Sequence, residues 1–185
     1  MNNRLIVRPL PSEEESAGWV TADERSAAAE FAPQRRREFL AWRAVVRREL
    51  GRGVTISYRE DGAPQVDCGV HIGVSHSRNL VAVVFGEAPC AVDTEPLGRN
   101  FNRVRRRYMT PAESALSDDP RMAAAVWCAK EALYKLAGRP ATDFLNDIAV
   151  TAVDFGAGTM RGTIHGSSEI GLAVEFLGDN VIVSC

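Results

Sequence analysis

Two short segments of the chain carry acidic side chains whose types and spacing favour phosphate chemistry. In the first, Asp93 and Glu95 flank Thr94 at the end of an apolar run, and the period of a β-strand points both carboxylates the same way. Such carboxylates repel each other unless a cation lies between them, and all-oxygen ligands favour Mg²⁺ or Mn²⁺ over zinc. An isolated Asp-x-Glu is usually a solvated turn, so this motif predicts a metal only with further ligands.

The second segment lies in the strongest helical pattern of the chain. Apolar residues recur at positions 126, 129, 133 and 136, and Trp127, Glu131 and Lys135 centre on the opposite face. That face is covered either by a ligand or by another part of the chain. The alternative is a surface Glu–Lys pair with the Trp at a subdomain boundary. Added to Asp93 and Glu95, the helix supplies a third carboxylate and a lysine, a set that suits phosphoryl transfer.

A third polar segment follows an expected strand. The sequence Gly73-Val74-Ser75-His76-Ser77 lacks the last glycine of a hydrolase nucleophile elbow and leads into another strand, which disfavours a serine hydrolase. A histidine between two hydroxyls is a reasonable donor set for a phosphate. A turn-capping serine with a structural histidine explains the segment as well. The sequence has neither a P-loop nor a Gly-x-Gly-x-x-Gly motif.

Composition is that of an ordinary globular protein. The 185 residues are 45% hydrophobic and 25% charged, and the net charge of −2 favours neither nucleic acid nor a membrane as partner. No apolar run is long enough to span a bilayer, and the N-terminus lacks a signal-peptide pattern. Four scattered cysteines indicate a reduced, cytoplasmic protein without a zinc site.

The positive charges are gathered locally. Such clusters in a nearly neutral chain favour an anionic ligand or an acidic partner, and the alternative is a solvated arginine-rich surface. One cluster comprises Arg35, Arg36, Arg37, Arg43, Arg47 and Arg48, and the other Arg99, Arg103, Arg105, Arg106 and Arg107.

The order of expected elements predicts two α+β halves, residues 1–97 and 98–185, each with a helix packed on an antiparallel sheet. In the first half, Thr21 and Glu24 form a capping box, and Pro33 and Gly51 bound the next helix. Strands are expected over residues 4–8, 54–59, 70–77, 80–85 and 90–94, the last two paired antiparallel.

In the second half, helical patterns precede a β-rich stretch. The main helix is expected to begin at Asp119 and Pro120 and to end at Gly138 and Pro140. Shorter helices are expected over residues 101–109 and 111–116, and strands over residues 148–154, 159–165, 170–176 and 181–184.

Together these segments resemble a known family. Residues 73–77, 91–95 and 127–135 look like the three signature motifs of the 4′-phosphopantetheinyl transferases, in the order and spacing of the larger, surfactin-synthetase-activating type. Residues 21–47 and 108–113 also resemble that type, so the similarity covers roughly residues 19–140.

The resemblance implies a pseudo-twofold arrangement of two similar α+β subdomains with the active site between them. It implies transfer of the phosphopantetheine arm of coenzyme A to a serine of an acyl or peptidyl carrier protein, with release of adenosine 3′,5′-bisphosphate. Asp93, Glu95 and Glu131 would hold Mg²⁺, with Mn²⁺ as an alternative. Glu131 would also act as the base for the carrier serine, and Lys135 would stabilise the leaving group or help the proton transfer.

The resemblance also implies contacts with coenzyme A and with the carrier. Ser75, His76, Lys130, Arg36 and Arg43 would contact coenzyme A. The family often has a lysine where Ala63 stands, so the arginines at positions 35–37 are candidates to replace it at the 3′-phosphate. Carrier proteins of this family are acidic around the modified serine, so we expect the carrier to dock on the basic residues Arg103, Arg106 and Arg107, which are close in sequence to the site. Two halves within one chain would allow a monomer, which is the expected state.

Two other functions fit some of these residues. One is a module that binds coenzyme A or a carrier protein without turnover, and the retained acids and Lys135 argue against it. The other is a Mg²⁺-dependent phosphohydrolase, which the absence of a nucleophilic Asp motif or a His cluster disfavours. The sequence does not distinguish carriers of fatty-acid, polyketide or nonribosomal peptide synthesis.

Overall fold

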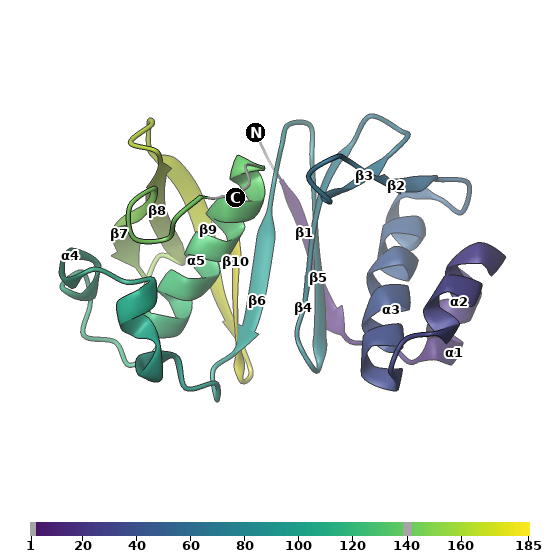
Figure 1. The fold of residues 1–185 in the computed structure, drawn as a ribbon, viewed down its shortest axis with the longest axis horizontal. Coiled ribbons are helices and arrows are strands. Elements are labelled where there is room, and N and C mark those ends of the chain that lie inside the picture. The colour runs from purple at the N-terminus through teal and green to yellow at the C-terminus, as the bar shows by residue number, and fades with distance from the viewer. Residues whose placement is uncertain (1–2, 139–141) are drawn as a thin grey trace. The chain divides into compact units, whose positions relative to one another are not determined.

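The computed structural model describes residues 3–138 and 142–185. The chain divides into two compact units, Met1–Pro89 and Cys90–Cys185. Each unit combines helices with an antiparallel sheet, so the predicted α+β class is confirmed (Figure 1). The division falls at Pro89 rather than at residue 97, because the strand that carries Asp93 and Glu95 is hydrogen-bonded within the second unit.

The N-terminal unit is built on a three-stranded sheet in the order β1-β5-β4. Helix α3 packs against β4 and β5, and α1 and α2 pack on α3. The core between helix and sheet includes Trp42 and Val46 from α3 and Val81 and Val83 from β5. The elements are β1 (Arg4–Pro9), α1 (Glu13–Ala17), α2 (Ala22–Ala29), α3 (Pro33–Leu50), β2 (Ile56–Tyr58), β3 (Pro64–Val66), β4 (His71–His76) and β5 (Leu80–Gly86).

Local signals set the ends of these helices as the sequence predicts. The Thr21 side chain accepts a hydrogen bond from the Glu24 backbone N–H, and the Glu24 carboxylate accepts one from the Thr21 backbone N–H. Pro33 opens α3 and Gly51 ends it with φ of 105°, a backbone angle that favours glycine.

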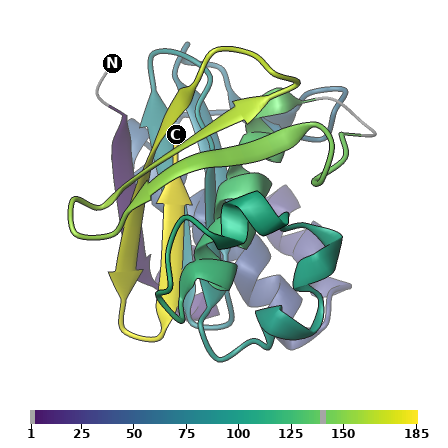
Figure 2. The same ribbon diagram turned by 90° about the vertical axis from the view of Figure 1, so that its left-hand side faces the viewer.

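The C-terminal unit is a five-stranded antiparallel sheet with α5 along one face (Figures 1 and 2). The strand order is β6-β10-β9-β8-β7. Val126, Ala129 and Leu133 of α5 are fully buried against the sheet, which confirms the predicted apolar face. The elements are β6 (Val92–Pro96), η1 (Phe101–Arg103), η2 (Arg105–Arg107), α4 (Pro111–Ser114), α5 (Met122–Ala137), β7 (Ile148–Asp154), β8 (Thr159–Ile164), β9 (Ile170–Leu177) and β10 (Asn180–Ser184).

A glycine in β8 allows α5 to approach the sheet closely. A Cβ atom on Gly162 would lie 2.7 Å from Leu133 Cδ1 and 2.8 Å from the Ala149 carbonyl oxygen. Real Cβ atoms do not approach a backbone oxygen so closely, so this position, on which Leu133 packs, requires glycine.

Three expectations about local structure were wrong. Residues 80–85 and 90–94 do not pair, because β5 lies between β1 and β4 while β6 pairs with β10. Residues 101–107 form two 3₁₀ turns rather than one α-helix. The main helix begins after Arg121, since the Asp119 carboxylate accepts from the Arg121 backbone N–H in a turn before it. Gly138 ends this helix in the left-handed conformation, as predicted, and Pro140 lies outside the described residues.

Candidate active site

Strand β6 and helix α5 bring the predicted acids and the lysine together within the C-terminal unit. Lys135 Nζ donates to Asp93 Oδ1 at 2.8 Å and to the Val92 carbonyl oxygen at 3.0 Å. Trp127 Nε1 donates to Glu95 Oε1 at 3.0 Å, and the Arg99 guanidinium forms an ion pair with the same oxygen. Lys135 therefore pairs across the elements with Asp93, rather than along the helix with Glu131 as the surface-pair interpretation required.

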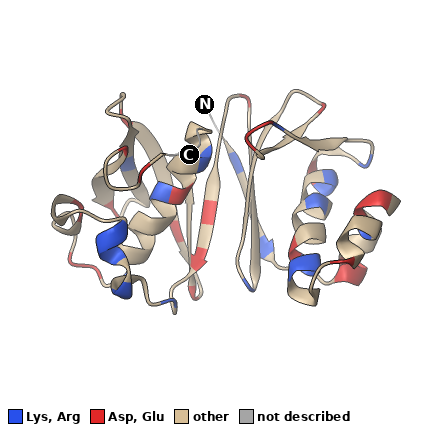
Figure 3. Cartoon of the chain, in the orientation of Figure 1, with Lys and Arg blue, Asp and Glu red and all other residues tan. Residues whose placement is uncertain are grey.

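The charges of Asp93 and Glu95 both act on the third acid, Glu131. Burial raises the pKa of Glu131, and the charge of Asp93 and, more weakly, that of Glu95 raise it further. Lys135 and Arg99 act in the opposite direction. Figure 3 shows the acidic positions of β6 and the acidic and basic positions of α5 that make up this group. A carboxyl group with a raised pKa is a better proton acceptor near neutral pH than an ordinary one.

The donor set fits a hard cation in its chemistry, because Asp93, Glu95 and Glu131 offer only carboxylate oxygens. They do not form a ready-made metal centre: within residues 3–138 and 142–185, no group of three or more His, Cys, Asp and Glu side chains is arranged to hold a metal ion. The Asp93 and Glu95 carboxylates bind Lys135, Arg99 and Trp127 instead.

Trp127 is covered by other parts of its own unit. Its ring lies 5.0 Å from that of Tyr108 in an edge-on contact, 5.7 Å from Phe144 and 6.4 Å from Phe101. The Arg99 guanidinium lies 5.1 Å from the Trp127 ring centre. Of the two explanations for a covered Trp, coverage by the chain itself is confirmed. Sequence reasoning missed Arg99 as a member of this group, although its position four residues after Glu95 is a signal.

Lys130, expected at coenzyme A, lies in the interior. Its side chain is 0% exposed, and Nζ lies 2.7 Å from Glu113 Oε1 and donates to the Phe144 carbonyl oxygen at 2.6 Å. Burial lowers the pKa of Lys130, and the bond to Glu113 works against that shift. Glu113 also accepts from the Val150 backbone N–H at 2.9 Å. The lysine therefore joins α5 to α4 and β7 and offers no surface to a ligand.

The serine–histidine segment lies in the N-terminal unit beside the first turns of α3. His76 Nε2 lies 3.2 Å from Arg35 Nη1, and His76 Nδ1 lies 3.5 Å from Glu38 Oε2. Ser75 is buried, and Arg35 is exposed. Arg35 and Glu38 face His76 because they are three residues apart on one helix, a spacing that the sequence analysis did not use.

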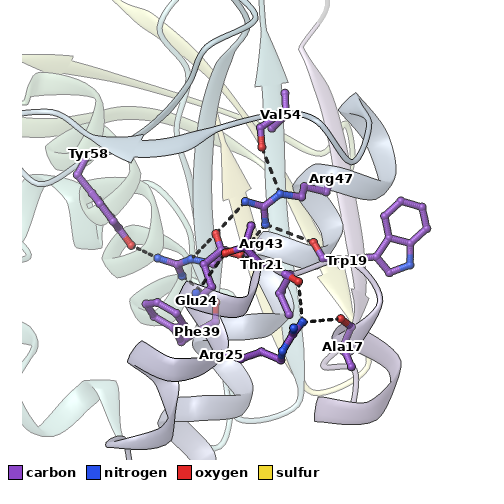
Figure 4. Close-up of polar contacts among 11 residues, drawn as sticks. Ala17, Trp19, Thr21, Glu24, Arg25, Phe39, Arg43, Arg47, Val54 and Tyr58 are labelled. Carbon is purple, nitrogen blue, oxygen red and sulfur yellow. Dashed lines mark hydrogen bonds and ion pairs between the residues drawn. The ribbon is translucent and has the colours of Figure 1, made fainter.

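The two arginines favoured for coenzyme A make internal bonds in this unit. Arg43 is only 3% exposed: it lies 3.3 Å from the Phe39 ring centre, hydrogen-bonds to the Tyr58 hydroxyl and pairs with Glu24 at 3.5 Å (Figure 4). Burial lowers the pKa of Arg43, and Tyr58 and Glu24 oppose the shift. Arg36 donates to backbone carbonyls at the end of α2, including that of Ala28 at 3.2 Å, and keeps a third of its side chain exposed.

Arg47 completes the interior cluster around Glu24. Its Nη1 and Nη2 donate to the two Glu24 oxygens at 2.7 and 2.9 Å, and Nε donates to the Val54 carbonyl oxygen (Figure 4). Burial works to raise the pKa of Glu24, but the bonds from Arg47 and from the Thr21 backbone outweigh it, and the pKa is lowered. The Glu24 carboxylate thus forms ion pairs with two buried guanidiniums, those of Arg43 and Arg47.

An acid-rich, oxygen-only group with a lysine beside it is typical of enzymes that transfer phosphoryl groups. Residues 89–180 match the model of the 4′-phosphopantetheinyl transferase superfamily, a stretch slightly under half of the 185 residues. This stretch contains the whole group from Asp93 to Lys135 and nearly all of the C-terminal unit, which is therefore the part of the chain that is similar to the superfamily. No curated protein matches the chain. No helix among the described residues has the length and apolar character that crossing a membrane requires.

Proposed function

We propose that the protein is a 4′-phosphopantetheinyl transferase, a holo-carrier-protein synthase of the surfactin-synthetase-activating type. The observation that carries the proposal is the joining of Asp93, Glu95, Glu131 and Lys135 in the stretch that matches the superfamily model. The substrates are coenzyme A and an acyl or peptidyl carrier protein.

In the proposed reaction, the carrier serine oxygen attacks the phosphorus that bears the pantetheine arm. A new oxygen–phosphorus bond forms, the pyrophosphate bond of coenzyme A breaks, and adenosine 3′,5′-bisphosphate leaves. Glu131 takes the serine proton, directly or through a water molecule, and its raised pKa supports this role. Lys135 stabilises the charge that develops on the leaving phosphate.

Asp93, Glu95 and Glu131 would hold the Mg²⁺ ion of this reaction. When bound, the ion neutralises the pyrophosphate charge. Mn²⁺ takes the same oxygen ligands and is the alternative. The three carboxylates support the proposal by their chemistry, and burial together with the charges of Asp93 and Glu95 raises the pKa of Glu131.

In the N-terminal unit, Ser75 and His76 are proposed to contact phosphates of coenzyme A. Arg35 adds a guanidinium beside His76, and Arg36 retains exposed surface for the same purpose. We assign Arg43 and Lys130 to the support of their units, because both are buried and hydrogen-bonded. The exposed basic residues Arg103, Arg106 and Arg107 are proposed to bind the acidic carrier.

One assay tests this function. The purified protein is incubated with an apo carrier protein, coenzyme A and Mg²⁺, and the carrier is weighed by mass spectrometry. The expected result is a carrier heavier by one phosphopantetheine group, together with adenosine 3′,5′-bisphosphate. Absence of the adduct on acyl, polyketide and peptidyl carriers alike would refute the transferase.

The same mixture separates the other functions. A module that binds without turnover would retain coenzyme A in equilibrium dialysis and leave the carrier mass unchanged. A phosphohydrolase would release adenosine 3′,5′-bisphosphate at the same rate with and without the carrier. The transferase releases it only as carrier serine is consumed.

A further inference from the structure

Arg99 lies against the acidic group of the C-terminal unit, and the proposed reaction gives it no role. Its guanidinium pairs with Glu95 Oε1, the oxygen that also accepts from Trp127 Nε1 at 3.0 Å. The same guanidinium lies 5.1 Å from the ring centre of Trp127 and 5.3 Å from that of Phe101. Arg99 therefore contacts both a carboxylate and two aromatic faces.

The charges of the group explain why a cation belongs at this place. The charges of Asp93 and Glu95 both act on Glu131, and Lys135 is bonded to Asp93. Arg99 is the cation that neutralises Glu95. Without it, the negative charges at the end of β6 would repel each other with less compensation.

We propose that Arg99 is the internal counter-ion of Glu95 in the metal-free protein and that a divalent cation must displace it from that carboxylate. The inference rests on the proposed metal site. A metal ion held by the Glu95 carboxylate would bring its positive charge next to the Arg99 guanidinium, and the two cations would repel each other. Arg99 therefore weakens the binding of Mg²⁺ and stabilises the acidic group until Mg²⁺ arrives.

The surroundings of Arg99 allow this exchange. Its side chain is 46% exposed, so leaving Glu95 does not open the core. A guanidinium over Trp or Phe is stabilised by the aromatic face, which gives Arg99 a place to remain after it leaves the carboxylate. Trp127 Nε1 donates to the same Glu95 oxygen, so its indole N–H reports a change of partner at that carboxylate.

Calorimetric titration of the protein with MgCl₂, without coenzyme A, tests the proposal. Arg99→Gln is expected to bind Mg²⁺ about two- to fivefold more tightly than the unsubstituted protein, the range for loss of a half-exposed ion pair. Arg99→Lys keeps the charge and is expected to stay close to the unsubstituted protein. The matched control is Arg161→Gln, which removes one positive charge from an exposed pair with Glu169 in the same unit.

A second readout follows the exchange directly. In the ¹⁵N spectrum, the Trp127 indole N–H signal is expected to shift on addition of Mg²⁺, with the titration midpoint of the calorimetric curve. In Arg99→Gln the midpoint moves to lower Mg²⁺ concentration. Neither measurement depends on turnover.

Three outcomes overturn the inference. Arg99→Gln binds Mg²⁺ no more tightly than the unsubstituted protein, Arg161→Gln tightens binding as much as Arg99→Gln, or neither the unsubstituted protein nor Arg99→Gln binds Mg²⁺ at millimolar concentration. The last also removes the proposed metal site. Failure of the transferase itself appears separately, as absence of the carrier adduct in the mass-spectrometric assay.

Discussion

The two units each gather charged side chains, but they balance them in opposite ways. In the N-terminal unit, one carboxylate, Glu24, serves the buried guanidiniums of Arg43 and Arg47. In the C-terminal unit, Asp93, Glu95 and Glu131 face the cations Lys135 and Arg99. The first cluster has more cations than acids and lies in the interior, whereas the second has more acids than cations and includes the half-exposed Arg99.

This difference is reflected in the pKa shifts of the two central glutamates. Burial works to raise the pKa of Glu24, but Arg47, the Thr21 backbone and Arg43 together outweigh it, so the pKa is lowered. The pKa of Glu131 is raised by burial and by Asp93. Where the surroundings stabilise the charged form of a carboxylate, the group contributes to the stability of the fold. Where they destabilise it, the carboxylate is available to bind a proton or a metal. The comparison therefore assigns structure to the first cluster and chemistry to the second.

The largest expected effect is on activity. Glu131→Gln keeps the shape of the side chain and removes its capacity to accept a proton, so phosphopantetheine transfer should fall by about 10²- to 10⁴-fold. The measurement is the initial rate of carrier adduct formation, with the circular dichroism spectrum showing that the fold is retained. Activity equal to that of the unsubstituted protein would contradict the role of Glu131.

The next effect is on stability and concerns the N-terminal unit. Glu24→Gln leaves two buried guanidiniums without a full negative charge, which is expected to lower the free energy of unfolding by about 3 kcal/mol. Urea denaturation at pH 7 measures the change. Glu14→Gln, on the exposed surface of α1, is the matched control and is expected to change stability by less than about 0.5 kcal/mol.

A smaller loss is expected where α5 meets its sheet. Gly162→Ala places a methyl group against Leu133 and the Ala149 carbonyl, so the free energy of unfolding should fall by about 1–3 kcal/mol. The control is Gly171→Ala, because a Cβ atom there would have no atom within 4 Å. Equal stability of the two variants in urea would show that α5 does not depend on this close approach.

The smallest expected effect is the change in unfolding free energy on Glu131→Gln, and its sign tests the comparison. A raised pKa means that the folded protein holds the Glu131 proton more tightly than the unfolded chain, so ionisation of Glu131 costs stability as pH rises from the ordinary glutamate pKa through the raised value. Metal-free Glu131→Gln should therefore be slightly more stable than the unsubstituted protein at pH 7, with the difference vanishing in acid.

The pKa shift of Glu24, and therefore its effect on stability, has the opposite sign. Its lowered pKa contributes stability above the ordinary glutamate pKa, and that stability is lost as pH falls through the lowered value. Urea midpoints of Glu24→Gln and Glu131→Gln from pH 7 down to pH 3, in the presence of a chelator, compare the two. If both substitutions shift stability in the same direction at pH 7, the contrast between the clusters fails.

Much of the local structure could be predicted from the sequence. The capping box of Thr21 and Glu24, the start of α3 at Pro33 and its end at Gly51 depend on residues within a few positions of one another. The apolar face of α5 at Val126, Ala129 and Leu133 follows from the helical period. The acids of the candidate site could likewise be predicted, because residue type and short-range spacing alone single out Asp93, Glu95 and Glu131.

Only the tertiary structure determined how these helices and strands pack together. Strand β6 pairs with β10, more than eighty residues away in sequence, and this long-range pairing places Asp93 and Glu95 beside α5 within the C-terminal unit. Burial of Arg43 and Lys130, both predicted at a ligand, likewise depends on partners supplied by other elements. A side chain's chemistry is set by its type, but its availability depends on what distant segments pack over it.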